Sequence, residues 1–167
     1  MDTDRNAELR GIEAFEAWLA DAPLEAIVDA WWRYTMRWDA AHAAGKEDEG
    51  PDWDDDPDGW AGQLVYDGLL MRSEEIARNF LRLAADRAPR ESPPGYAPVR
   101  YLGAAAIESF VHHTDDLDRF LWVEKTAKES PAFREALRDV YWPTEPWKHI
   151  EVDPLVAETI ERIQNLP

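Results

Sequence analysis

Apolar residues recur along this chain at intervals of three and four positions, which is the spacing of one face of an α-helix. The first such stripe consists of Ile27, Trp31, Tyr34 and Trp38. Further stripes follow at Ile76, Phe80 and Leu83, at Val99, Gly103, Ala106 and Phe110, and at Val156, Ile160 and Ile163. No segment shows a convincing alternation of apolar and polar residues, the pattern of a strand. The sequence therefore predicts an all-α fold.

Capping signals indicate where the predicted helices begin. An oxygen-bearing residue stands directly before proline at Asp56-Pro57, Ser130-Pro131 and Asp153-Pro154, the arrangement of an N-cap followed by proline at the first helical position. Ser73 and Thr114 each precede two acidic residues, which a helix N-terminus favours. We expect helices over residues 4–20, 23–44, 58–71, 74–88, 98–113, 115–129, 131–141 and 154–166.

The connections between these helices predict how they are arranged. Short links after residues 20, 71, 113 and 129 indicate neighbours that run antiparallel. The predicted architecture is a single domain, residues 1–167, with about seven to eight helices in antiparallel hairpins around one core. The chain has no internal repeat, so a short α-solenoid is an alternative only in an irregular form. Two segments are predicted loops, the acidic stretch 46–59 and the Pro-rich stretch 89–98.

The charge balance narrows the class of partner. The 167 residues include 35 Asp and Glu against 18 Lys and Arg, a net charge of −17, so direct binding to nucleic-acid phosphate is disfavoured. The chain has no cysteine, which excludes disulfides and thiolate chemistry. The first ten residues are polar and no stretch is apolar enough for a signal or membrane helix, so we expect a cytoplasmic protein that does not enter a membrane.

The acidic loop contains eight Asp and Glu residues and one Lys. Asp54, Asp55 and Asp58, together with the isolated Trp53, are the predicted partner-binding residues, because acids and one aromatic suit contact with a basic protein surface. The loop also matches the first half of a calcium-binding loop, but Val65 stands where the completing acid is required. Helix capping and solvation explain the same acids without a ligand.

A second candidate site lies near residue 110. Glu108 and His112 are four residues apart on one predicted helix face, a spacing that two metal ligands can use, and Asp116 is the candidate third ligand. Capping beside a turn explains the same residues without a metal. The sequence contains no G-x-S-x-G, Gly-rich phosphate loop or H-E-x-x-H motif, so no catalytic residue and no cofactor is predicted.

The chain has nine tryptophans. An aromatic ligand cage or binding surface is one interpretation, and core packing is the expected one, of Trp31, Trp32, Trp38, Trp122, Trp142 and Trp147. Trp32 lies about 100° around the helix from Trp31, so we expect one of these two indoles at an edge of the core.

The arginines between residues 72 and 90 form the only basic stretch of the chain. Glu74 is four residues before Arg78, and Asp86 lies beside Arg82 and Arg87. We therefore expect a solvent face that neutralises itself rather than a site for an anionic ligand.

A series of motifs lies between residues 98 and 142: Leu102-Gly103-Ala104 with Glu108 and His113, followed by Ser130-Pro131-Ala132-Phe133-Arg134, Ala136-Leu137 and Val140-Tyr141. This pattern resembles an uncharacterised bacterial family, a domain of unknown function, whose members are small, helical and Trp-rich. The resemblance is looser at Trp31-Trp32 and over residues 57–70, and it implies no activity. Members usually have Gly after the His, where this chain has Thr114. From the residues themselves, the small side chains of 103–106 predict a close approach of two helices.

Three functions are compatible with these features. The favoured one is a protein-interaction module of the immunity or inhibitor kind, which uses the acidic loop to bind a basic partner surface. The first alternative is a metal-assisted enzyme that uses Glu108, His112 and Asp116, or the loop acids from Asp54 to Asp58. The second is a structural or regulatory subunit that binds through a hydrophobic groove between helices.

Overall fold

A computed structural model of the chain describes residues 23–45, 55–70, 73–89, 98–112, 116–144 and 152–167. These residues form seven helical stretches and no strand, so the all-α prediction is confirmed. The stretches are α3 (Leu24–Ala43), α4 (Gly59–Gln63) with the π-helical η2 (Leu64–Leu69), α6 (Glu74–Asp86), α7 (Pro98–Leu102) with the π-helical η3 (Gly103–Ile107) and α8 (Glu108–His112), α9 (Leu117–Glu129), α10 (Pro131–Ala136) with the 3₁₀ turn η4 (Leu137–Asp139), and α11 (Pro154–Gln164). The helix predicted over residues 4–20 lies outside the described residues.

Side-chain caps explain why several helices begin where the sequence indicates. Ser130 Oγ accepts a hydrogen bond from the Phe133 amide at 3.1 Å, and Asp153 accepts one from the Leu155 amide at 2.8 Å. Each bond satisfies an amide that has no partner inside its helix. The predicted cap at Asp56 is wrong: α4 begins at Gly59, one residue after the expected start, and the residue at its N-cap position is Asp58.

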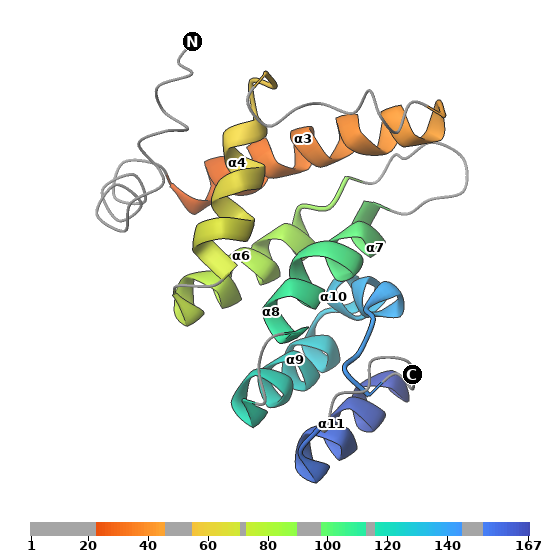
Figure 1. The fold of residues 1–167 in the computed structure, drawn as a ribbon. Helices are drawn as coiled ribbons and strands as arrows, with labels where there is room; N and C mark the ends of the chain where they lie inside the picture. The colour runs from red at the N-terminus through yellow and green to blue at the C-terminus, as the bar shows by residue number, and fades with distance from the viewer. Residues whose placement is uncertain (1–22, 46–54, 71–72, 90–97, 113–115, 145–151) are drawn as a thin grey trace.

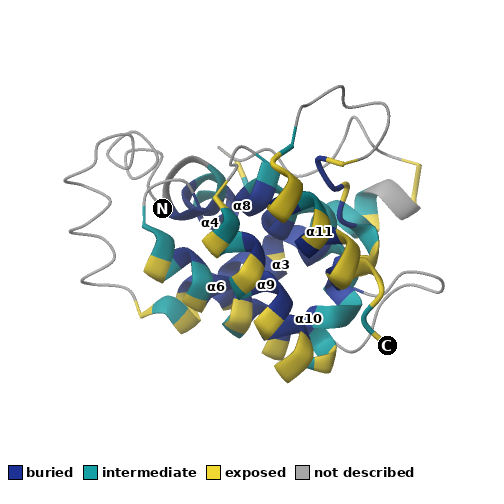
Figure 2. Ribbon diagram, turned by 90° about the horizontal axis from the view of Figure 1, so that it is seen from below, coloured by how far each residue is buried: buried dark blue, intermediate teal, exposed yellow. Residues whose placement is uncertain are grey.

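The helices follow one another across the molecule, from α3 and α4 at one end to α9 and α11 at the other (Figure 1). Helix α3 packs on α4 and α6, α10 packs on α6, α7 and α9, and α11 packs on α9. Each helix turns its buried side toward the interior and its exposed side outward (Figure 2). Within the described ranges, every helix is too short or too polar to span the hydrocarbon layer of a membrane.

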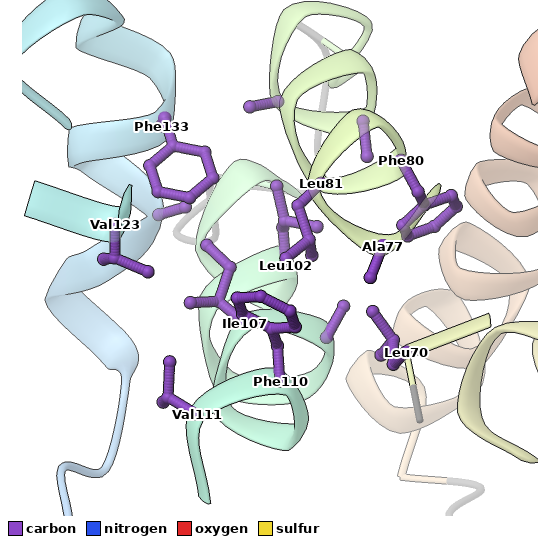
Figure 3. Close-up of a cluster of buried hydrophobic side chains, with 14 of the residues drawn as sticks. Leu70, Ala77, Phe80, Leu81, Leu102, Ile107, Phe110, Val111, Val123 and Phe133 are labelled. Carbon is purple, nitrogen blue, oxygen red and sulfur yellow. The ribbon is translucent and has the colours of Figure 1, made fainter. Parts of the chain in front are cut away.

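The stretch α7–η3–α8 lies at the centre of the core. Its Leu102, Ile107 and Phe110 lie between Phe80 of α6 on one side and Phe133 of α10 on the other (Figure 3). All five side chains are fully buried, so each contributes most of the roughly 1.5–3 kcal/mol available from burying a large apolar side chain. One cluster of buried residues runs from Ile27 in α3 to Ile163 in α11.

Both neighbouring tryptophans of α3 are buried, so the expectation of an indole at the edge is wrong. Trp31 is 0% exposed and Trp32 is 4% exposed, because α4 and α6 cover two sides of α3. The Trp32 indole nitrogen donates to the carbonyl oxygen of Ala84 in α6 at 2.9 Å. This bond satisfies the polar group of a side chain that would otherwise be costly to bury.

Gly103 confirms the predicted close approach of two helices. A Cβ atom built at this position would lie 1.8 Å from the carbonyl oxygen of Ala136 and 3.4 Å from Cγ2 of Val140. Only glycine leaves room for α10 at this distance. The α7–η3–α8 stretch and α10 are therefore in backbone contact.

An ion-pair group joins the last helix to α9. The Glu124 carboxylate is buried and accepts from Arg162 Nη2 of α11 at 3.0 Å and from Lys128 Nζ at 2.6 Å. Hydrogen bonds from Arg162 and Lys128 lower the pKa of Glu124 and outweigh the opposite effect of burial. The charge on Glu124 thus links α11 to the rest of the helices.

Candidate functional site

Four side chains form an ion-pair cluster between α3 and the start of α4: Arg33, Arg37, Asp56 and Asp58. Arg33 donates to both carboxylate oxygens of Asp58, from Nε at 3.1 Å and from Nη2 at 2.7 Å. Arg37 donates from Nε to Asp56 at 2.7 Å and from Nη2 to Asp58 at 2.8 Å. Asp56 also accepts from the amide of Asp58 at 2.8 Å, which closes a turn before α4.

The sequence positions these groups locally. Arg33 and Arg37 are one helical turn apart, so both guanidinium groups lie on the same side of α3. Burial alone would raise the pKa of the Asp58 carboxyl, but hydrogen bonds from Arg33 and Arg37 outweigh it and hold the pKa below its ordinary value. The hydrogen bond to Asp56 likewise raises the pKa of Arg37. Asp58 and the two arginines are therefore charged at neutral pH, and two bidentate contacts fix the geometry of the cluster.

Of the predicted partner-binding residues, one belongs to this ion-pair cluster and another is exposed to solvent. Asp58 is bound to two arginines of its own chain and is 8% exposed. Asp55 is exposed and lies between the fixed residues and the rest of the loop. Trp53 and Asp54 lie outside the described residues. The acids of the loop thus have two roles, since Asp56 and Asp58 hold α4 against α3 whereas Asp55 faces solvent.

The second candidate site brings together two of its three predicted residues. His112 Nδ1 lies 3.6 Å from Glu108 Oε1, as the four-residue spacing predicts. Glu108 Oε2 also accepts from the Tyr141 amide at 3.3 Å. Asp116 instead caps α9, where it accepts from the Asp118 amide at 3.0 Å. In the part of the chain that the structure describes, no three His, Asp or Glu side chains are grouped to hold a metal ion.

The loop acids do not form a cation site within the described residues either. Asp56 and Asp58 direct their carboxylate oxygens to guanidinium groups, and an oxygen so engaged is a poor ligand for Ca²⁺. The residue expected to complete such a loop, Val65, is buried in the core. Among the residues that the structure describes, the metal-assisted alternative therefore has no assembled ligand set in either place.

A groove of about 300 Å³ lies beside Glu108 and His112. The two π-helical segments contribute Tyr66 and Ala104 to its lining. The Ser109 hydroxyl, also in the lining, donates to the carbonyl of Ala105 at 2.8 Å, so its proton is engaged within the helix. Burial raises the pKa of the Tyr66 phenol, which stays neutral at physiological pH. The groove thus offers a carboxylate and an imidazole, without a serine aligned for nucleophilic attack.

We compared the chain with models of known protein families, with characterised proteins and with solved structures. None of the three comparisons finds a match. The resemblance of residues 98–142 to a family of small helical proteins stays a prediction.

Only some of the arginines in and directly after α6 form the ion pairs that the sequence predicts. Arg78 pairs with Glu74, as expected, and Glu74 also accepts from Arg119 Nε of α9 at 3.3 Å. Arg87 reaches α3 and contacts Asp29 at 2.9 Å instead of pairing with Asp86. The expectation of local neutralisation is therefore correct for Arg78 and wrong for Arg87.

Nearly all basic side chains of the described residues are engaged within the chain. These residues include twelve Arg and Lys, and ten of them have a carboxylate within 4.0 Å. Within the described ranges, Arg82 and Arg134 are the two without such a partner. Among the described residues, few basic groups are therefore left to pair with further acids, and the net charge of −17 gives the protein a field of negative sign.

Proposed function

We propose that this protein is an interaction module of the immunity or inhibitor kind, which binds a basic surface on a partner protein through an acidic face at the exposed Asp55 of the acidic loop 46–59. The observation that carries the proposal is the internal pairing of ten of the twelve described basic side chains. Basic groups that are already paired do not neutralise the remaining acids, so these acids are available to a partner.

The ion-pair cluster supports the same function by fixing the position of the face. Asp56 and Asp58 are held by Arg33 and Arg37, and Asp55 directly precedes them in the chain. A binding residue next to a fixed backbone loses less conformational freedom on association than one in a freely moving loop. Asp55 is thus presented on a preorganised support.

Charge complementarity also predicts how the complex forms. Opposite fields accelerate diffusional encounter, and salt screens this attraction over about 8–10 Å at physiological ionic strength. We therefore expect association to slow as salt rises, while dissociation changes less. Direct binding to nucleic acid is not part of the proposal, since the same field repels phosphate.

Charge reversal at Asp55 tests the proposal. Wild type, Asp55→Lys and Glu161→Lys are immobilised and used to capture partners from a lysate of the source organism at low salt, and the association rate of each captured protein is then measured. Glu161 is an exposed acid on α11, so the control changes the net charge equally at a different place. Asp58 is left intact, because its replacement would break the cluster.

The expected result is a basic partner that Glu161→Lys binds at nearly the wild-type rate and Asp55→Lys binds at least several-fold more slowly. If the two variants bind the partner at equal rates, Asp55 is not part of the interface. Capture that is indifferent to salt would reject the electrostatic mechanism as a whole.

A further inference from the structure

A groove lies between α10 and the end of α11. It has a volume of about 570 Å³, which is within the range of sites for small organic ligands. The lining combines charged residues of α10 with apolar residues of both elements and is formed by Pro131, Arg134, Glu135, Leu137, Arg138, Val140, Trp142, Ile163, Gln164, Leu166 and Pro167.

Arg134 is the distinctive residue of this groove. It is half-buried, and no carboxylate of the described residues lies within 4.0 Å of it, although the chain carries a net charge of −17. Ten other basic groups of the described residues have such a partner. An unpaired guanidinium in a partly desolvated groove is costly, and an anionic ligand would remove that cost.

A second guanidinium lines the same groove. Arg138 follows Arg134 by four residues, and two like charges at this spacing on one helical segment repel each other. Glu135 compensates only one of them, since it pairs with Arg138 at 3.1 Å. Arg134 therefore keeps its charge without a carboxylate partner among the described residues, and a single ligand carboxylate would supply one.

The remainder of the lining is apolar. Leu137, Val140, Trp142 and Ile163 are each at most 7% exposed and form the floor of the groove. An apolar ligand body placed there leaves water and gains roughly 25 cal/mol for each Å² it buries. The site thus joins a cationic rim to a hydrophobic floor.

We propose that this groove binds a small monocarboxylic acid with an apolar body, its carboxylate on Arg134 and its hydrocarbon on the floor. Guanidinium groups match carboxylates in planar geometry and donate two hydrogen bonds at once. A single negative charge fits better than a double one, because Glu135 lines the groove and the whole molecule is strongly acidic. The site is separate from the acidic face, so neither proposal depends on the other.

Octanoate, octanol and acetate are suitable probes. Octanoate has both the hydrocarbon and the carboxylate of the proposed ligand. Octanol has the hydrocarbon alone, and acetate has the carboxylate alone. Binding to the full chain is measured by calorimetry, and the site is located by amide chemical shifts in NMR spectra. We expect octanoate to bind at least about tenfold more tightly than either of the other probes, with shifts at Val140 and Ile163.

Two arginine variants make the test specific. Arg134→Gln removes the proposed anion ligand and is expected to weaken octanoate binding about tenfold while leaving octanol binding unchanged. Arg82→Gln is the matched control, because Arg82 is the other described basic residue without a carboxylate partner and lies on α6 outside the groove. It should bind octanoate as the wild type does.

Three results would overturn the proposal. The first is wild-type protein that does not bind octanoate at millimolar concentration. The second is an equal loss of binding in Arg134→Gln and Arg82→Gln, which would indicate a general effect of net charge. The third is a set of chemical-shift changes that leaves Val140 and Ile163 unaffected.

Discussion

Replacement of Gly103 by Ala tests the central packing contact of the fold. The added Cβ would lie 1.8 Å from the Ala136 carbonyl oxygen, and real Cβ atoms essentially never lie closer than 3.0 Å to such an atom. The α7–η3–α8 stretch and α10 must therefore separate by at least 1.2 Å, the difference between those distances. A gap of this size forfeits a large part of the dispersion energy across the interface.

The two terms of the free-energy change have opposite signs. Alanine favours the helix by about 1 kcal/mol over glycine. Overpacking costs about 1–3 kcal/mol, and a clash with backbone lies at the upper end of this range, because backbone cannot rotate away. We expect a net loss of about 2 kcal/mol in the free energy of unfolding, which corresponds to a lower melting temperature by roughly 4–8 °C.

Urea unfolding followed by circular dichroism measures the effect, and Gly62→Ala is the control. A Cβ at Gly62 would lie 2.9 Å from Cε1 of the Tyr34 ring, a side-chain atom that can shift. The same substitution in α4 should therefore change stability by less than about 1 kcal/mol. A Gly103→Ala variant as stable as the wild type, or less destabilised than Gly62→Ala, would show that Gly103 is not required for the close contact with α10.

Two further predictions concern the buried ion pairs. Because the pKa of Asp58 is below its ordinary value of 3.8, its contribution to stability is complete above that pH and is lost as the pH falls through the lowered pKa. Asp58→Asn should be less stable at pH 7 and show a weaker fall of the urea midpoint below pH 4, whereas an unchanged acid profile would contradict the cluster. Glu124→Gln removes the charge that holds Arg162, so amides of α11 should exchange hydrogen faster while those of α3 do not. Uniform exchange rates in both helices would show that Glu124 does not link α11 to α9.

The fold could be predicted from the sequence where the determining interactions are local. Ser130 and Asp153 cap helices through amides two or three residues away, and the apolar stripe of α11 is buried at Val156, Ile160 and Ile163. Such contacts are contained in a window of a few residues. For the helices that the structure describes, the predicted boundaries accordingly agree with the observed ones to within a few residues.

Contacts between residues that are distant in the chain could not be predicted from local sequence patterns. The indole of Trp32 finds its acceptor 52 residues away at Ala84, and Arg37 finds Asp56 after 19 residues. Nothing near Asp58 in the sequence shows that its carboxylate serves the chain itself. The spacing of Arg33 and Arg37 is the one available signal, and its meaning depends on which segment packs against that side of α3.

The groove between α10 and α11 could not be predicted from the sequence for a similar reason. Arg134 and Arg138 can be recognised as neighbours on one helix, but the apolar floor comes partly from Ile163, almost thirty residues later. The π-helical turns at η2 and η3 also have no clear sequence signal, since the same residues fit a regular α-helix.

The ion-pair cluster has a consequence for how this chain can change over evolutionary time. Because Arg33 and Arg37 hold the start of α4, the connection that leaves α3 does not have to supply that contact. Each doubling of a connection's length costs only about 0.6 kcal/mol of closure entropy. Descendants of this sequence can therefore lengthen, shorten or rewrite the segment before Asp55 while α3 and α4 stay together.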